Sequence, residues 1–435
     1  MADCDAKRNH ENVDLLRSSC RFRDMNRFLS GDEHHFKFVA PRPSRFWNWV
    51  MSGYRHNLIR KTHSVSAYAY EELDRLKDLV KSGARILIAP NHSDHADGLA
   101  LYQLADEVDT MFCYMATHQL FEGSFGLRYF IFPRCGVFPI DREGSALGAL
   151  KAAKDVLIRL GYPLVVYPEG EIYHTNDRLT PLREGAAAMA LTSQRALKDG
   201  SGIYIVPVAL KYRYLDPEGT MKGLSKQLSK LEARFTWIAN PEESIPRRIY
   251  RFASGLLALK EVEYLGSPSS GTVPDRVENL RDKLLERMEN RHVGKVGDED
   301  FPERVNTVHR RILEQLKEKE ISEARRAACR RDLEVLFIVV QLFSYPGDYI
   351  HEYPTVERIA ETLIKFEQDL ADGGYVTPVS DRQLTFRIGE PIDMRDYLGQ
   401  KTKEAVPKVT EVLFQRLQQS LDEMGRGTHV KDLKH

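Results

Sequence analysis

One short segment of the chain holds an imidazole and several carboxylates directly after an apolar run at residues 86–89, and it reads Asn91-His92-Ser93-Asp94-His95-Ala96-Asp97. His92 and Asp97 are five positions apart, which a regular helix at about 100° per residue would separate by roughly 140°. Their side chains can meet only if the chain turns sharply first, and Pro90 and a capping Asp94 favour such a turn before a helix that starts near His95. A carboxylate on one ring nitrogen would then fix the tautomer, so that the other nitrogen can take a proton from a hydroxyl.

The elements that must position this segment are short apolar runs that alternate with helix-like stretches. The apolar runs cover residues 86–89, 111–114, 137–140, 164–167 and 203–206, and the helix-like stretches between them include 146–160 and 185–197. This alternation predicts an α/β fold with a largely parallel central sheet flanked by helices. Residues that do chemistry are then expected in the loops after the carboxyl ends of the strands.

Three further blocks follow such runs in order: Gly136…Asp141-Arg142, then Tyr167-Pro168-Glu169-Gly170, then Val206-Pro207-Val208. Each block alone is weak evidence for a function, because a strand followed by a polar turn is common in α/β proteins. Together with Asn91-His92…Asp97 they resemble the 1-acyl-glycerol-3-phosphate acyltransferase family and its relatives, over about residues 80–215. The turn Gly389-Glu390-Pro391-Ile392 is similar to the closing strand of that family.

The resemblance implies roles for several residues. His92 would be the general base and Asp97 its partner, while Arg142, Glu169 and Gly170 would bind the acceptor. Asn91 and Arg178 are further candidate site residues. The donor would be an acyl thioester on coenzyme A or acyl carrier protein, and the acceptor a hydroxyl of a lysolipid or similar glycerophospholipid-like molecule. The resemblance implies neither a separate cofactor nor a metal.

One departure from the family pattern concerns the acceptor. The family continues Glu-Gly with Thr-Arg, whereas this chain continues with Glu171-Ile172. The arginine of that pattern is expected to help bind phosphate, and a guanidinium suits phosphate recognition. Either Arg178 or Arg183 would have to supply the missing charge, or the acceptor lacks a phosphate at that point.

Two rival interpretations stay open. The dense cluster His92, Asp94, His95 and Asp97 could hold the metal of a metal-dependent hydrolase. Alternatively, the chain could keep the fold and a lipid-binding surface without turnover, as a catalytically silent scaffold.

Composition narrows the class of protein. The 435 residues carry 63 Lys plus Arg and 63 Asp plus Glu, so no net charge argues for nucleic acid as a partner. The five cysteines are odd in number and form no Cys-x-x-Cys pair, which suits a reducing cytoplasm. The first residues lack an apolar core segment, so we expect no secretory signal, and no run approaches the roughly 20 apolar residues that span a bilayer. The longest apolar run, residues 335–343, is expected to be a buried helix or strand. We therefore expect a cytoplasmic protein whose membrane contact, if any, is peripheral at the inner face.

The chain divides into four predicted parts. Residues 1–64 are a lead-in with an aromatic segment, 65–217 an α/β domain, 218–379 a helical accessory region, and 380–435 the closing strand and last helix. In the lead-in, Phe46, Trp49, Val50 and Tyr54 would share one helix face. That face suits a bilayer interface or packing on the domain, and the sequence does not decide between them. We find no internal repeat.

Overall fold

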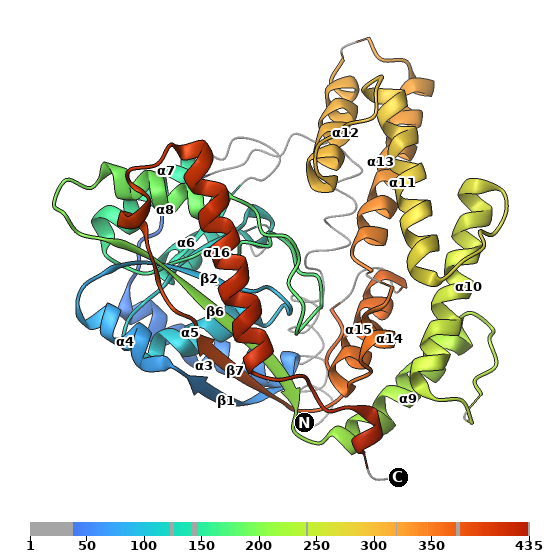
Figure 1. The fold of residues 1–435 in the computed structure, drawn as a ribbon, viewed down its shortest axis with the longest axis horizontal. Helices are drawn as coiled ribbons and strands as arrows, with labels where there is room; N and C mark the ends of the chain where they lie inside the picture. Colours follow the sequence, from blue (N-terminus) through green and yellow to red (C-terminus); the bar gives the residue numbers. More distant parts are fainter. Residues whose placement is uncertain are drawn as a thin grey trace. The chain divides into compact units, whose positions relative to one another are not determined.

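The computed structural model describes residues 38–121, 126–140, 147–240, 242–318, 320–345, 347–370 and 375–433 (Figure 1). These residues form two compact units. Within the described ranges, the larger unit contains residues 38–223, 355–365 and 377–433, and the smaller contains residues 224–354 and 366–376.

The larger unit is built on an eight-stranded sheet with the order β1-β7-β6-β2-β5-β3-β4, in which β8 also pairs with β6. The strands are β1 (Val65–Glu71), β2 (Arg85–Pro90), β3 (Cys113–Thr117), β4 (Val137–Ile140), β5 (Leu164–Val165), β6 (Ile203–Tyr214), β7 (Arg382–Ile388) and β8 (Ile392–Asp393). Only the pairings of β6 with β7 and with β8 are antiparallel. The predicted fold class, α/β with a largely parallel central sheet flanked by helices, is confirmed.

We call residues 91–97 the motif segment. The antiparallel pairing of β6 with β7 decides which residues lie beside it. Because β7 is antiparallel to β6, its first residue Arg382 pairs with Tyr214 at the carboxyl end of β6. β1 is parallel to β7 and starts beside the same residue, since Val65 also pairs with Arg382. The starts of β1 and β7 therefore lie at the edge of the sheet where the parallel strands end.

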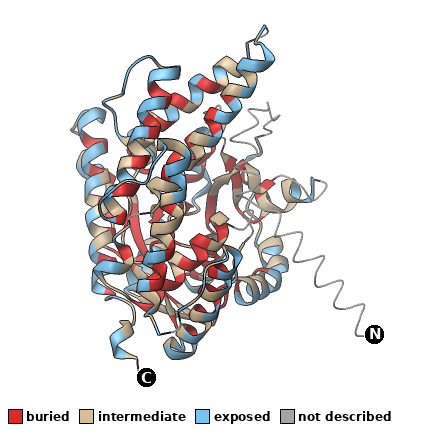
Figure 2. Ribbon diagram, turned by 90° about the vertical axis from the view of Figure 1, so that its right-hand side faces the viewer, coloured by how far each residue is buried: buried red, intermediate tan, exposed pale blue. Residues whose placement is uncertain are grey.

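Alternating strand residues face two separate cores. Leu87 and Ala89 of β2 belong to one core, and Ile86 and Ile88 to the other. The first core is covered by α7 (Leu147–Asp155), α8 (Gly185–Ala196) and α16 (Thr402–Glu423), and Figure 1 shows α16 running across that face. The second core is covered by α3 (Arg45–His63), α4 (Leu73–Lys81) and α5 (Asp97–Glu107). In Figure 2 the buried residues follow the strands and the inner sides of the helices.

Most predicted elements of the larger unit are present. The runs 86–89, 137–140 and 203–206 lie inside β2, β4 and β6, while 111–114 and 164–167 overlap β3 and β5. The stretch 146–160 forms α7 and a π-helical turn, Val156–Leu160, and the stretch 185–197 forms α8. The runs do not predict β1, most of whose side chains are only half-buried.

The smaller unit is helical. Its helices are α10 (Ile245–Leu265), α11 (Val273–His292), α12 (Phe301–Leu316), α13 (Glu323–Phe343) and α14 (Tyr349–Glu352), and the chain enters or leaves the unit within α9 (Pro217–Arg234) and α15 (Val356–Leu370). Side chains from α10 to α13 form one apolar core. The apolar run 335–343 is the end of α13, with Leu336 and Val339 buried as expected.

An internal repeat of 28 residues organises this unit, so the prediction of no repeat is wrong. Three successive helices, α10 to α12, each begin with a capping residue, an apolar residue, a proline, any residue and an arginine. The N-caps are Ser244, Thr272 and Asp300, and the arginines are Arg248, Arg276 and Arg304. The residue after each arginine, Ile249, Val277 or Val305, is also apolar and buried, whereas the exposed positions of the three helices vary.

The repeated arginines make the same contact. Each donates through Nε and Nη2 to both oxygens of a glutamate near the end of the preceding helix, and these pairs are Arg248–Glu232, Arg276–Glu261 and Arg304–Glu289. The glutamates are almost fully buried, at 0%, 0% and 2% exposure. A bidentate partner stabilises a buried carboxylate, because an unpaired charge in the interior would lower the stability of the fold. The repeat therefore sets the spacing of successive helices.

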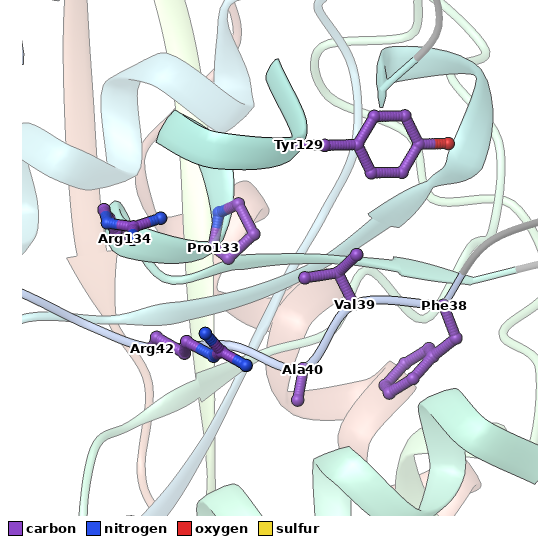
Figure 3. A pocket seen from close by; sticks show the side chains of 7 residues that line it. All are labelled: Phe38, Val39, Ala40, Arg42, Tyr129, Pro133 and Arg134. Atoms are coloured by element: carbon purple, nitrogen blue, oxygen red, sulfur yellow. The ribbon is translucent and has the colours of Figure 1, made fainter. Parts of the chain in front are cut away.

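The aromatic side of α3 is exposed. Phe46, Trp49, Val50 and Tyr54 are 62%, 70%, 43% and 51% exposed, while Arg55, Ile59 and His63 face the domain. Packing of the aromatic face on the domain, one of the two interpretations of this segment, is therefore wrong. Beside α3 lies α6 (Leu127–Arg134), and between α6 and the segment that precedes α3 is a pocket of about 350 Å³ (Figure 3). Among the described residues, no helix is long and apolar enough to cross a membrane.

Candidate active site

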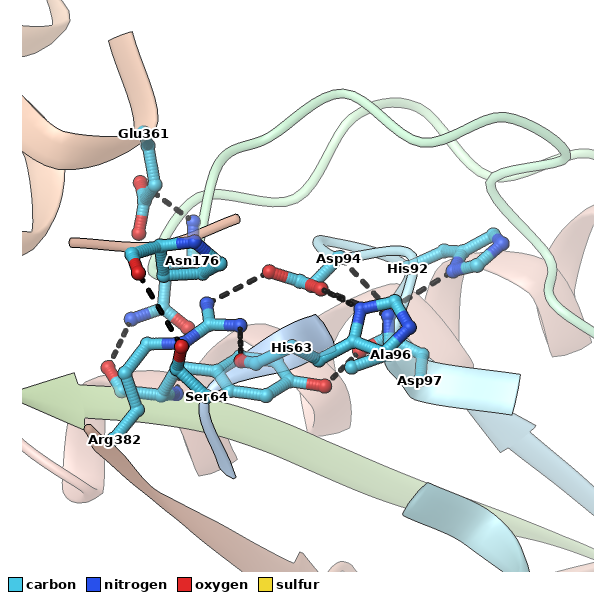
Figure 4. A network of polar contacts seen from close by, with 11 residues as sticks. His63, Ser64, His92, Asp94, Ala96, Asp97, Asn176, Glu361 and Arg382 are labelled. Carbon is cyan, nitrogen blue, oxygen red and sulfur yellow. Dashed lines mark hydrogen bonds and ion pairs between the residues drawn. The ribbon is translucent and has the colours of Figure 1, made fainter. Parts of the chain in front are cut away.

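The motif segment forms a tight loop between β2 and α5. β2 ends at Pro90, and α5 begins at Asp97, slightly later than the predicted start near His95. Asp94 does not cap the helix directly; its Oδ1 accepts a hydrogen bond of 2.8 Å from the backbone N–H of Ala96 inside the loop. The loop brings Nδ1 of His92 to 2.9 Å from Oδ2 of Asp97 (Figure 4). The sharp turn that the spacing requires is therefore present.

The Asp97 carboxylate is fully buried and accepts three hydrogen bonds. Besides the His92 ring, its donors are the backbone N–H of Asp94 at 3.0 Å and the hydroxyl of Tyr212 at 2.6 Å. Burial raises the pKa of Asp97, and the hydrogen bonds from His92 and Tyr212 oppose that rise. A carboxylate bound in this way holds the proton of the imidazole on Nδ1, so that Nε2 is the basic nitrogen.

The His92 ring packs against an aromatic side chain but is not enclosed. It stacks on Tyr167 with ring centroids 3.9 Å apart, and the backbone N–H of His92 donates to Oε1 of Glu169 at 2.7 Å. The side chain is 16% exposed, and within the described ranges its Nε2 has no hydrogen-bond partner. This nitrogen can therefore accept a proton from a molecule that approaches the edge of the sheet.

A second network supports the loop from the far side (Figure 4). Arg382, the first residue of β7, donates to Oδ2 of Asp94 and to the backbone carbonyl of His63, each at 2.7 Å. Burial would raise the pKa of Asp94, but the charge of Arg382 and the neighbouring His63 outweigh it and hold that pKa well below its usual range. Burial also lowers the pKa of His63 to about 4.

The two networks meet at one aromatic ring. The guanidinium of Arg382 lies over the ring of Tyr212, 4.6 Å from its centroid, and the hydroxyl of that ring donates to Asp97. Tyr212 and Arg382 thus bind adjacent carboxylates of the motif segment from neighbouring strands. Their position follows from the antiparallel pairing of β6 with β7, which brings the start of β7 to this edge.

Glu169 lies between two loops. Its Oε1 accepts the backbone N–H of His92, and its Oε2 accepts the N–H and the hydroxyl of Thr180 at 3.1 and 2.6 Å. The side chain is 4% exposed, and burial raises its pKa. These contacts orient the His92 backbone; the predicted role of Glu169 in acceptor binding stays a prediction.

Gly170 adopts a left-handed conformation with φ at +80°. A Cβ there would lie 2.6 Å from Nε of Arg183, whose exposed side chain runs directly beside the glycine. The predicted acceptor-binding turn thus has a guanidinium at its surface. Arg178, the other predicted cation of this loop, accepts a hydrogen bond from Thr175 through its backbone carbonyl. Arg142 lies outside the described residues.

Two asparagines attach the site loops to the edge of β6. Asn91 exchanges hydrogen bonds of 2.7 and 3.1 Å with the backbone of Leu210, and Asn176 exchanges bonds of 2.8 and 2.7 Å with the backbone of Tyr212. Each amide side chain thus continues the strand pairing where the neighbouring strand has ended. Asn91 fixes the loop that carries His92, and Asn176 fixes the loop after Gly170.

Sequence reasoning did not find Tyr212, Arg382, Thr180 or His63. Tyr212 follows the Val206-Pro207-Val208 block on the same strand, and its alternation marks it only as a strand residue. Arg382 is 288 positions from its partner Asp94, so no local spacing indicates the contact. A buried cation opposite a motif carboxylate can be found only once the strand order is known.

Residues 65–211 match the family model described as Acyltransferase. This part of the chain is an acyltransferase domain. The match supports acyl transfer as its general activity and accords with the order of motifs in the sequence. A search of curated proteins found no match to the chain. The acyltransferase domain contains β1 to β5, most of β6 and the His92–Asp97 pair, while β7 and Arg382 come from beyond it.

Proposed function

We propose that the protein moves a fatty acyl group from a thioester, on coenzyme A or acyl carrier protein, to a hydroxyl of a glycerophospholipid-like acceptor. The observation that carries this proposal is the contact of 2.9 Å between Nδ1 of His92 and the buried carboxylate of Asp97, within an acyltransferase domain. Because this contact occupies Nδ1, Nε2 is the ring nitrogen left to act as the base.

In the proposed reaction, Nε2 of His92 takes the proton of the acceptor hydroxyl as its oxygen attacks the thioester carbonyl carbon. A tetrahedral oxyanion forms and then collapses, so that the carbon–sulfur bond breaks and the new ester remains. The imidazolium returns its proton to the departing thiolate. Asp97 stabilises the imidazolium between these steps, as the carboxylate of a serine-protease triad does, while the acceptor supplies the nucleophilic hydroxyl.

On the acceptor side, a cation lies beside the Gly170 turn. Glu171-Ile172 replaces the Thr-Arg of the family pattern, and the Arg183 side chain lies directly beside Gly170. We propose that Arg183 supplies the positive charge that Ile172 does not, and that it binds a phosphate or another anionic group of the acceptor. Arg142 stays a predicted acceptor-binding residue.

The test is incubation with acyl-coenzyme A or acyl carrier protein and a mixed lysolipid panel, read by mass spectrometry. We expect one acceptor class to gain the mass of an acyl chain while free thiol appears in equal amount. His92→Ala should lower turnover by about 10²–10⁴-fold, whereas His351→Ala, an exposed histidine of the smaller unit, should not. Unchanged turnover in His92→Ala would refute the role of the imidazole.

The same experiment separates the rival interpretations. A silent scaffold would bind lysolipid and release no thiol. A metal-dependent hydrolase would need the motif carboxylates as ligands, yet Asp94 is bound to Arg382 and Asp97 to Tyr212 and His92. Among the described residues, no group of three or more potential ligands is arranged to hold a metal ion. The acyltransferase proposal accounts for these contacts better.

A further inference from the structure

Two neighbouring helices of the larger unit expose several large apolar side chains. We call this set the aromatic surface: Phe46, Trp49, Val50 and Tyr54 of α3, with Leu127 and Phe130 of α6. Leu127 and Phe130 are 57% and 44% exposed, as the α3 residues are. Trp47 joins the two helices, because its ring meets Phe130 edge-on at 5.4 Å. Exposed apolar side chains that cluster in this way, rather than occurring singly, mark an interaction site.

The two helices that carry the aromatic surface contain basic residues and no acidic ones. Neither α3 nor α6 contains an aspartate or a glutamate, and together they carry Arg45, Arg55, Arg60, Lys61, Arg128 and Arg134. Of these, Arg45, Arg60 and Lys61 are exposed. The exposed Asp109 lies 3.8 Å from Arg45, which is a weak, solvent-screened contact. The surroundings therefore favour an anionic partner.

A pocket with two guanidinium groups adjoins this surface (Figure 3). It is lined by Phe38, Val39, Ala40, Arg42, Tyr129, Pro133 and Arg134. The Arg134 guanidinium lies 3.6 Å from the centroid of the Phe130 ring, so the pocket and the aromatic surface share this contact. Across the described part of the chain, no carboxylate lies within ion-pair distance of Arg42 or Arg134. Two unneutralised cations beside an apolar wall suit a phosphate carried on a lipid.

We propose that the aromatic surface docks on an anionic phospholipid bilayer, with a lipid headgroup phosphate held between Arg42 and Arg134. Trp, Tyr and Phe would lie at the level of the headgroups, and the flanking cations would contact anionic lipid. A second copy of this chain fits less well, because the same cations would then face each other. This inference rests on the proposed function in one respect: a protein docked on the bilayer would take its lipid acceptor from that bilayer.

The test is co-sedimentation of the full chain with vesicles, which requires no turnover. One set contains phosphatidylcholine alone, and the other contains phosphatidylcholine with about 30 mol% phosphatidylglycerol, which gives the vesicles a negative surface potential. We expect binding to the anionic vesicles only. Trp49→Ala with Phe130→Ala should weaken it by roughly tenfold. Arg42→Gln with Arg134→Gln should weaken it by about 30-fold, since each cation near an anionic surface contributes about fivefold.

Matched controls keep the result specific. Ile238→Ala removes an apolar side chain that is 90% exposed in the smaller unit, and it should leave vesicle binding unchanged. His92→Ala should bind vesicles like the wild type, so a failed acyl-transfer assay and a failed docking assay can be told apart. Equal binding to both vesicle sets, wild-type binding by either double variant, or a dimer that the Trp49/Phe130 variant abolishes would overturn the proposal. Binding of millimolar inorganic phosphate by a chain that does not bind vesicles would also overturn it, because the pocket would then serve a free anion.

Discussion

Replacing Tyr212 with phenylalanine removes one of three hydrogen bonds to the carboxylate that orients His92. The hydroxyl lies 2.6 Å from Oδ1 of Asp97, and both side chains are buried, at 3% and 0% exposure. Burial, with the nearby Asp97, holds the pKa of Tyr212 well above its usual value, so the group is a donor at any working pH. Tyr212 touches no reacting atom in the proposed mechanism and is therefore a positioning residue.

The expected magnitude follows from the charge of the acceptor. A hydrogen bond to a charged group contributes about 1.5–3 kcal/mol. If that stabilisation supports the imidazolium in the transition state, its loss lowers kcat by about 10–150-fold, at 1.36 kcal/mol per factor of ten. The KM for the acceptor should change little, because the hydroxyl is buried behind the carboxylate. The acid limb of kcat/KM should move to higher pH, since Asp97 keeps its proton to higher pH after it loses a donor.

The assay is acyl transfer to the acceptor that the lysolipid panel identifies, measured from pH 5 to 9 by thiol release. Tyr114→Phe is the matched control, because Tyr114 is also a buried tyrosine of the sheet and its hydroxyl has no hydrogen-bond partner in the described structure. It should keep kcat within about twofold. Wild-type kcat in Tyr212→Phe, a change confined to KM, or an acid limb that moves to lower pH would refute the positioning role.

Three further predictions concern stability. Burial lowers the pKa of His63 to about 4, so the folded state favours the neutral imidazole. The free energy of unfolding should therefore fall by about 2 kcal/mol from pH 7.5 to pH 5. In urea titrations, His63→Gln should remove this part of the pH dependence. Arg248→Ala removes the bidentate partner of the buried Glu232 and leaves it only the contact with Arg251, so it should destabilise the helical unit by about 3 kcal/mol in denaturant unfolding. Gly170→Ala should lower the melting temperature through a cost of about 1–2 kcal/mol, since φ is +80° and the added methyl group meets Arg183.

Each stability prediction has an outcome that would contradict it. A His63→Gln variant with the wild-type pH slope would show that another group takes up the proton. For the helical repeat, Arg247→Ala is the neighbouring control, because its side chain is 81% exposed and its loss should cost under about 0.5 kcal/mol. An equal loss of unfolding free energy in both variants would argue against the view that the buried arginine–glutamate pair sets the spacing of the helices. An unchanged melting temperature in Gly170→Ala would mean that the turn relaxes.

Much of the fold follows from local pattern. Apolar runs of four residues, alternating with longer periodic stretches, predict the strands of a parallel sheet and its flanking helices, because each element must bury one face. The parallel order then sends residues such as Asn91 and Glu169 to one edge of the sheet. The sequence did not reveal the repeat of the smaller unit, because the recurring caps, prolines and arginines are single positions 28 residues apart. Their shared role is seen only once the helices that they begin are known.

The sequence by itself determined that His92 and Asp97 lie together after a strand, because that contact needs only five residues and a turn that Pro90 favours. Only the tertiary structure decided which side chains bind the carboxylates there, Asp97 and Asp94. Tyr212 and Arg382 reach the motif segment through strand pairing between β6 and β7, and such pairing depends on packing energies summed over the whole sheet. It likewise decided that the aromatic face of α3 is turned outward, since the same periodicity fits a helix with either face against its domain.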